Sequence, residues 1–253
     1  MNKSKGFTLI ELMVVISIIA LLMAILMPTL SRAKELAAEV ACMSNLKQWG
    51  VVYSMFTSEH NSRFPSQGFV VDKSYWENLD LLFCPLATKS YDEGGRNPIA
   101  AWKVEGTEKG VSKGSFGVNN WCGDDRGQPL GGYKDALWIT ADHKGSERIP
   151  LFFDCFSLYV APLYTDQPPV FSGQNPPFWA SGGWGHGEDA MRGACIDRHN
   201  GYINMLFVDY SVRKAGLKEL WYLRWHKRWD QTMQEQPPPV WPQWMRLMKD
   251  YDR

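Results

Sequence analysis

A surplus of one charge sign, catalytic motifs and closely spaced cysteines are all missing from this sequence. Lysine and arginine together number 27, as do aspartate and glutamate, so the basic surplus expected of a nucleic-acid binder is absent. No G-x-S-x-G, H-E-x-x-H, P-loop or metal-spaced histidine pair occurs, so no enzymatic activity is predicted. The glycine-rich stretch Gly182–Gly187 lacks the flanking strand and helix that a phosphate-binding loop needs, and we expect a flexible loop there.

Cysteine usage excludes two further kinds of site. The five cysteines are spread along the chain without a C-x-x-C pair, which argues against a zinc knuckle and against a thioredoxin-like centre. They are Cys42, Cys84, Cys122, Cys155 and Cys195. An exported domain would permit disulfides, and the odd number leaves at least one thiol over.

The sequence does contain one long apolar run, Phe7 to Met27, whose only polar side chains are Thr8, Glu11 and Ser17. As a helix rising about 1.5 Å per residue, this run spans roughly 31 Å, which is enough to cross the core of a bilayer. The residues that follow offer no small-residue site for removal of a secretory signal. We therefore expect the run to stay on the chain as a membrane helix.

Glu11 is the unusual residue of this run. A charged side chain in the middle of a bilayer costs up to about 2.5–3.5 kcal/mol unless it is paired, and the cost is smaller near the end of a helix. Glu11 could therefore simply lie at the membrane interface, or its carboxylate could pair with a cationic group. The residue alone leaves both interpretations open.

The residues around Glu11 favour the second interpretation. Lys3, Lys5 and the segment from Gly6 to Glu11, GFTLIE, resemble the class III signal of type IV pilins and type II secretion pseudopilins. This resemblance implies that prepilin peptidase cuts between Gly6 and Phe7, that Phe7 becomes the N-methylated first residue, and that Glu11 becomes the fifth. Because a methylated amine is still a cation, Phe7 of one subunit could pair with Glu11 of its neighbour in a helical bundle.

The resemblance also implies a location. The chain would cross the bacterial inner membrane once, with its globular part outside the cytoplasm, and would later enter a periplasmic or extracellular filament. Its implied partners are prepilin peptidase, the inner membrane, and other copies or related pilin-like subunits that pack through the N-terminal helix. Charge does not set this orientation, because lysine and arginine flank the apolar run on both sides.

Helical periodicity continues after Pro28 to about His60. We expect an amphipathic continuation of the membrane helix over residues 28–60, either kinked at Pro28 or divided there into two helices. Its apolar positions recur at steps of three and four: Leu36, Val40, Met43, Leu46, Trp49, Tyr53 and Phe56.

Scattered segments resemble a narrower group, the prepilin-like proteins of planctomycetes, verrucomicrobia and their relatives. They are Cys42–Gly50 (CMSNLKQWG), Phe64-Pro65, Phe83-Cys84-Pro85, Ser115–Asn119, and the pair His199 and Asp209, which matches a His-x9-Asp-Gly signature. Tyr210 replaces the glycine of that signature, so a tight turn requiring a positive φ there would be strained or of another type. Within this resemblance we hypothesise a Cys42–Cys84 disulfide that pins the first loop of the domain to the helix.

The rest of the chain predicts an α+β, pilin-like fold. A long N-terminal membrane helix would pack on a small antiparallel sheet with extended loops and a C-terminal helix. Short strands are expected at 68–71 and 115–118, a buried pair at 149–153 and 157–160, and a hairpin of 202–208 with 211–214. Residues 161–193, with five prolines, are expected to form an ordered surface excursion.

The C-terminal helix is expected over residues 217–233. Leu217, Trp221, Trp225 and Trp229 are spaced by four, a pattern more typical of core packing than of a binding platform. The expected organisation is a leader (1–6), an assembly helix (7–27), its continuation (28–60), an exported globular domain (61–236) and a tail (237–253).

One metal site is left open, and no other cofactor is expected. Asp197 or Asp209 could join loop carbonyls around Ca²⁺, by analogy with calcium-binding pseudopilins. The alternative is that His199 and Asp209, near opposite ends of one strand, only form hydrogen bonds to loops.

These observations predict a structural subunit of a type II secretion pseudopilus or of a type IV pilus-like filament. A second hypothesis is a minor tip or membrane-anchored recognition subunit that uses the aromatic residues of 161–185 on a glycan or surface ligand. A third, an anchored hydrolase, would require His143, His186 or His226 to share a pocket with carboxylates.

Overall fold

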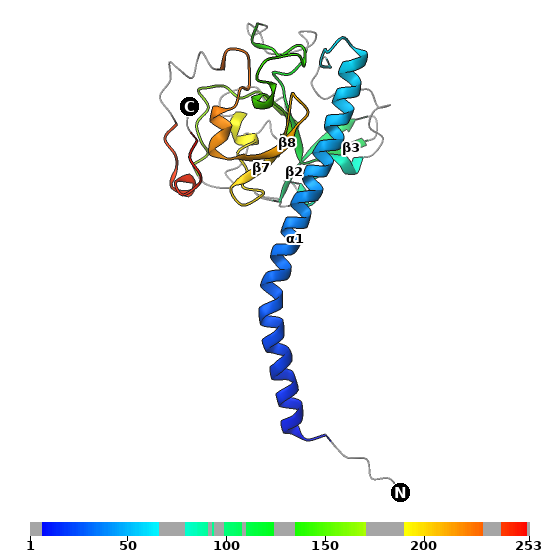
Figure 1. Ribbon diagram of the computed structural model, residues 1–253, viewed down its shortest axis with the longest axis vertical. Coiled ribbons are helices and arrows are strands. Elements are labelled where there is room, and N and C mark those ends of the chain that lie inside the picture. Colours follow the sequence, from blue (N-terminus) through cyan, green and yellow to red (C-terminus); the bar gives the residue numbers. More distant parts are fainter. Residues whose placement is uncertain are drawn as a thin grey trace. The chain divides into compact units, whose positions relative to one another are not determined.

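The computed structural model describes residues 7–65, 79–90, 93, 99–107, 110–123, 135–170, 190–229 and 239–251. The chain divides into two compact units, residues 1–38 and 39–253. One helix, α1 (Leu9–Glu59), contributes to both units, while the strands and the short 3₁₀ helices belong to the second (Figure 1). The predicted leader, residues 1–6, and the predicted strand at 68–71 lie outside the described residues.

The first unit consists of the apolar part of α1. Every side chain from Phe7 to Ala37 is exposed, and among the described residues α1 is long and apolar enough to cross a membrane. The helix continues through Pro28, so the alternative of two separate helices is wrong. Two hydroxyls bond back to the helix backbone: Ser17 donates to the carbonyl of Met13 at 2.7 Å, and Thr29 donates to that of Leu26 at 2.8 Å.

In the second unit, one face of α1 forms part of the core. Its buried residues are Cys42, Leu46, Trp49, Gly50, Tyr53 and Thr57. The predicted stripe is thus confirmed for Leu46, Trp49 and Tyr53, whereas Leu36 and Val40 are 60% and 66% exposed. The core face therefore begins at Cys42, two turns later than the periodicity predicted.

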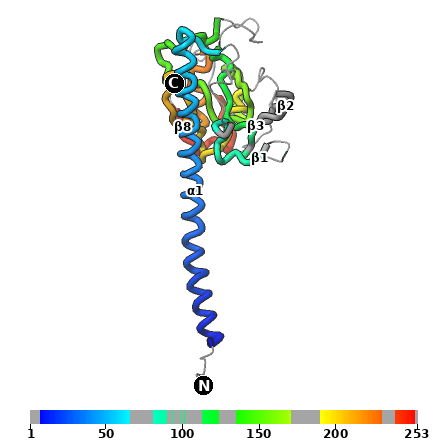
Figure 2. Tube along the Cα trace, turned by 90° about the vertical axis from the view of Figure 1, so that its right-hand side faces the viewer, coloured from blue at the N-terminus to red at the C-terminus, as the bar shows by residue number. Residues whose placement is uncertain are grey.

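Gly50 lets the helix come close to the sheet. A Cβ at this position would lie 3.0 Å from Cδ1 of Leu206 and 3.5 Å from the carbonyl oxygen of Tyr210. Trp49, on the adjacent position, packs its ring 5.1 Å from that of Phe152. The end of α1 therefore rests directly on the strands (Figure 2).

The sheet beneath α1 has five strands in the order β6-β4-β5-β7-β8. They are β4 (Phe116–Asn119), β5 (Pro150–Asp154), β6 (Tyr159–Val160), β7 (Tyr202–Phe207) and β8 (Val212–Gly216). The predicted strands at 149–153 and 157–160 exist but are not neighbours, because β4 lies between them, antiparallel to β5 and parallel to β6. The sheet is therefore mixed, and not purely antiparallel as predicted.

A second sheet of three strands was not predicted. β1 (Lys89–Ser90) pairs in parallel with β2 (Ala100–Thr107), which pairs antiparallel with β3 (Gly110–Gly114). The sequence here is rich in glycine and charged residues, and the short alternation Trp102-Lys103-Val104-Glu105, which is typical of a strand, was missed.

The β7–β8 hairpin confirms the predicted pairing of 202–208 with 211–214, with Tyr202 opposite Gly216 and Leu206 opposite Val212. Tyr210, in its turn, has φ 62°, the left-handed conformation that glycine adopts without cost. The tyrosine is anchored to α1 instead: its hydroxyl lies 2.6 Å from Oγ1 of Thr57, and its carbonyl accepts a 2.9 Å hydrogen bond from Nζ of Lys47.

The predicted C-terminal helix is wrong over its described part. A 3₁₀ helix, Lys218–Tyr222, is followed by turns, although all four residues of the predicted stripe are buried. Backbone groups that an α-helix would pair are used elsewhere: the N–H of Arg224 donates to the carbonyl of Arg148 at 2.9 Å. The carbonyl of Leu220, its partner in an α-helix, accepts the indole N–H of Trp225 at 2.6 Å.

Candidate functional site

The N-terminal end of α1 is the first candidate site. Thr8 precedes the helix and Glu11 is its third residue, and the two form reciprocal hydrogen bonds. Oε2 of Glu11 accepts from the backbone N–H of Thr8 at 2.9 Å and from its hydroxyl at 2.7 Å, and Oγ1 of Thr8 accepts from the N–H of Glu11 at 3.2 Å. This is a capping box, which satisfies N–H groups that a helix end otherwise leaves unpaired.

The capping box gives Glu11 a role within its own chain. The T-x-x-E spacing signals such a box, and this reading of the sequence was missed. Both of its hydrogen bonds use Oε2, so Oε1 accepts none from the described residues. Phe7, one residue before the cap, is 71% exposed, and Gly6 lies outside the described residues.

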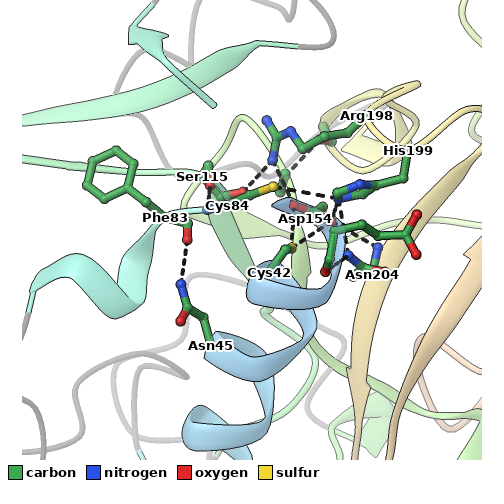
Figure 3. Close-up of polar contacts among 12 residues, drawn as sticks. Cys42, Asn45, Phe83, Cys84, Ser115, Asp154, Arg198, His199 and Asn204 are labelled. Carbon is green, nitrogen blue, oxygen red and sulfur yellow. Dashed lines mark hydrogen bonds and ion pairs between the residues drawn. The ribbon is translucent and has the colours of Figure 1, made fainter. Parts of the chain in front are cut away.

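The second candidate site is a buried polar cluster in the second unit. It comprises Cys42 on α1, Cys84 after the 3₁₀ helix Leu79–Leu82, Asp154 at the end of β5, and His199 in the turn before β7. One ligand atom from each of these four buried residues lies within 4.8 Å of the others. Figure 3 shows them pointing toward one another from four separate segments of the chain.

Asp154 is the centre of this polar cluster. Its Oδ1 accepts from Nη1 of Arg198 at 3.0 Å, and its Oδ2 accepts from the backbone N–H of Asn204 at 2.9 Å and lies 3.0 Å from Nε2 of His199. Burial alone would raise the pKa of Asp154, but the hydrogen bond with His199 and the charge of Arg198 lower it below its usual value. Asp154 is therefore an ionised carboxylate inside the core, paired with an equally buried guanidinium.

The two thiols differ in their ionisation. Burial raises the pKa of Cys42 well above its usual value. A hydrogen bond from Cys42 lowers the pKa of Cys84 to about 6 against the opposing effect of burial, and His199 and Arg198 assist. Burial lowers the pKa of His199, but hydrogen bonds with Asp154 and Cys84 outweigh it and raise the value to about 9. The cluster thus favours thiolate over thiol at Cys84.

Neighbouring hydrogen bonds hold these segments together (Figure 3). Nδ2 of Asn45, one turn beyond Cys42 on α1, donates to the carbonyl of Phe83 at 2.9 Å. Oγ of Ser115 accepts from the N–H of Cys84 at 2.6 Å, and the carbonyl of Ser115 accepts from Arg198 at 2.8 Å. The motif segments around Cys42, Cys84 and Ser115 are therefore parts of one structural unit.

Comparison with known proteins gives two findings. The prokaryotic N-terminal methylation motif matches residues 1–27. The type IV wide pilus major component PilA4 of Thermus thermophilus is 31% identical over 124 residues, which cover 47% of this chain and 95% of that protein. The chain belongs to the type IV pilin family. No solved structure matches this pilin, and more than half of it lies outside the aligned region.

The structure brings together some of the residues predicted for the pilin's sites. Cys42 and Cys84 meet in the cluster, but both are free thiols here, so the disulfide stays a prediction. His199 lies with them and not with Asp209. Asp154 is the fourth member of the cluster. No pattern in the sequence predicts this, because 112 positions separate Asp154 from Cys42.

In the described part of the pilin, neither carboxylate proposed for calcium belongs to a group of three or more histidine, cysteine, aspartate or glutamate ligands. Oδ1 of Asp197 accepts from the N–H of Gly201 at 2.5 Å. Oδ1 of Asp209 accepts from the N–H and the hydroxyl of Ser211, at 2.9 and 2.6 Å. Both carboxylates thus bond within their own turns, and calcium binding there stays an untested prediction.

The histidines considered for a hydrolase are packing residues where they are described. His226 lies between Trp121 and Trp229, with ring centroids 4.9 and 5.2 Å away, and neither of its nitrogens has a hydrogen-bond partner in the described structure. Burial lowers its pKa to about 4. His143 packs against Trp138 at 4.8 Å, and His186 lies outside the described residues.

Proposed function

We propose that this pilin is a structural subunit of a type IV pilus-like filament or of a type II secretion pseudopilus. In this proposal prepilin peptidase cuts between Gly6 and Phe7 and methylates Phe7. The observation that carries the proposal is the capped apolar helix, whose side chains from Phe7 to Ala37 are all exposed. Such a surface requires a membrane before assembly and other helices after it.

Glu11 would act through its two oxygens in different ways. Oε2 is engaged with Thr8 of the same chain, and Oε1 accepts no hydrogen bond from the described residues. In a filament, Oε1 would meet the methylated amine of Phe7 from a neighbouring subunit. One carboxylate would then cap its own helix and neutralise a cation that is costly to bury alone.

The pilus is the leading choice between the two filaments, because the aligned relative is named as a major pilus component. The recognition hypothesis stays an untested alternative. Of its aromatic residues, Tyr164 is partly buried and the others lie outside the described residues. Six of the chain's tryptophans are core residues: Trp49, Trp121, Trp138, Trp221, Trp225 and Trp229.

Two substitutions separate processing from assembly. Gly6→Val should leave the leader attached, because the peptidase acts at the Gly6–Phe7 bond. Glu11→Ala should be cut and methylated normally but yield no filaments, whereas Thr8→Val keeps the carboxylate and should still assemble. Intact mass and N-terminal peptides report processing, and electron microscopy of sheared surface fractions reports assembly. Normal filaments from Glu11→Ala, or a wild-type chain that retains residues 1–6, would refute the proposal.

A further inference from the structure

The buried cluster has the composition of a metal site. Two sulfurs, one imidazole nitrogen and one carboxylate oxygen converge within 4.8 Å of one another, and all four residues are buried. Cysteine, histidine and aspartate are all zinc ligands, and zinc prefers four of them in a tetrahedron. We propose that Cys42, Cys84, Asp154 and His199 bind a single zinc ion in the second unit of this pilin.

The distances within the cluster fit this geometry. Zinc lies about 2.3 Å from sulfur and about 2.0–2.2 Å from nitrogen or oxygen, so tetrahedral ligand atoms are about 3.3–3.8 Å apart. Sγ of Cys42 is 3.5 Å from Oδ2 of Asp154, and Sγ of Cys84 is 3.6 Å from Nε2 of His199. Nε2 of His199 and Oδ2 of Asp154 are closer, at 3.0 Å, and none of the four ligand atoms is more than 4.8 Å from another. Small side-chain movements would therefore complete the tetrahedron.

The charges also balance. Two thiolates and one carboxylate around Zn²⁺ leave one negative charge, and the buried guanidinium of Arg198 supplies the matching positive charge. Nη1 of Arg198 bonds to Oδ1 of Asp154, so Oδ2 remains directed at the cluster. Arg198 would thus orient the carboxylate ligand and keep the buried set neutral.

Without a cation, His199 has two polar neighbours at one ring nitrogen. Its Nε2 lies 3.0 Å from an acceptor, Oδ2 of Asp154, and 3.1 Å from a donor, Nδ2 of Asn204. The amide of Asn204, whose Oδ1 has no partner in the described structure, can be turned so that Oδ1 faces Nε2, and a protonated His199 can then donate to both neighbours. A zinc ion would take the lone pair of Nε2 and a lone pair of Oδ2, and so replace the contact between them.

A Cys42–Cys84 disulfide is the competing outcome. In an exported domain, two neighbouring thiols become oxidised unless something holds them reduced. A disulfide would use only the sulfurs and would give no reason for His199 and Asp154 to converge on the same point. With four protein ligands, the zinc would have no open position for a reactant, so the site would be structural and not catalytic.

Zinc content and stability of the full-length chain in detergent test the proposal. The protein should retain one zinc per chain after purification without added metal, and its melting temperature should fall with a strong chelator and recover with Zn²⁺. Replacing zinc with Co²⁺ should produce the absorption of a tetrahedral thiolate complex in the wild-type chain. This measurement needs no variant and does not depend on a variant folding.

Variants locate the ion. Cys84→Ser and His199→Gln should each lose at least ten-fold in zinc affinity, whereas Cys195→Ala, a buried cysteine outside the cluster, should bind zinc as the wild type does. Glu11→Ala should also bind zinc normally, which separates this proposal from filament assembly. A native Cys42–Cys84 disulfide in non-reducing peptide maps would overturn the proposal, as would reduced wild-type protein that binds neither Zn²⁺ nor Co²⁺.

Discussion

The two units of this pilin place their charged groups in opposite ways. In the first unit, the single carboxylate between Phe7 and Met27 is exposed and bonds to a residue three positions away. In the second, a carboxylate and a guanidinium are fully buried and come from segments 44 positions apart. Because Glu11 bonds only within its own helix end, the surface of the first unit stays available to other chains. The buried pair of Asp154 and Arg198 instead joins two distant segments and so stabilises the fold of the second unit.

The largest effect should come from breaking the buried pair. Asp154→Ala leaves the guanidinium of Arg198 buried without its counter-charge, which should cost about 3–5 kcal/mol of unfolding free energy. Denaturant unfolding in the presence of chelator measures this loss apart from any bound metal. The same protein should still be cut after Gly6, because the processing signal lies in the other unit.

A double substitution is the control for this prediction. Asp154→Asn with Arg198→Met removes both charges and should recover a substantial part of the lost stability, since no unpaired ion remains. Glu11→Ala should leave the unfolding free energy of the second unit unchanged. If Asp154→Ala unfolds at the wild-type denaturant concentration, the pair does not hold the fold.

The first unit could be read from the sequence because its information is contiguous. The segment from Gly6 to Glu11 overlaps the start of the apolar run, and the methylation motif, which matches residues 1–27, confirms both. The β7–β8 hairpin was predictable for the same reason: one turn joins both of its strands.

The second unit was less predictable because its pairings are distant. Nothing in the sequence shows that β4 separates β5 from β6, or that Asp154 meets Cys42. The tryptophan spacing correctly predicted burial but wrongly predicted a helix. Trp225 shows why, because its indole N–H takes a carbonyl that the helix needed and its own carbonyl accepts from Asn119 and Trp138.

A smaller effect should appear in acid, through His226. Its folded pKa of about 4 lies below the usual value near 6.5, so the unfolded chain binds more protons between these limits. The contribution of neutral His226 to the free energy of unfolding is complete above about pH 6.5. It is lost as the pH falls toward 4, and the loss amounts to up to about 3 kcal/mol. The charge of Arg228 acts in the same direction as burial.

His226→Phe isolates this effect from the other groups that titrate in acid. Phenylalanine keeps an aromatic ring between Trp121 and Trp229 but cannot be protonated. The variant should therefore lose less stability than the wild type between pH 6.5 and 4, as measured by denaturant unfolding at each pH. Parallel pH profiles would mean that folding does not lower the pKa of His226.

The smallest predicted effect concerns the turn at Tyr210, where a side chain compensates for a backbone conformation that favours glycine. Because the hydroxyl of Thr57 donates to the carbonyl of Tyr53 at 2.9 Å, the tyrosine hydroxyl is the donor to Thr57. Tyr210→Phe should cost about 1 kcal/mol, the usual net value of one hydrogen bond. Thr57→Val should cost at least as much, and the double substitution should cost less than the two single losses combined. Additive losses in chemical unfolding would show that the turn is held by its ring packing and by Lys47, and not by the tyrosine hydroxyl.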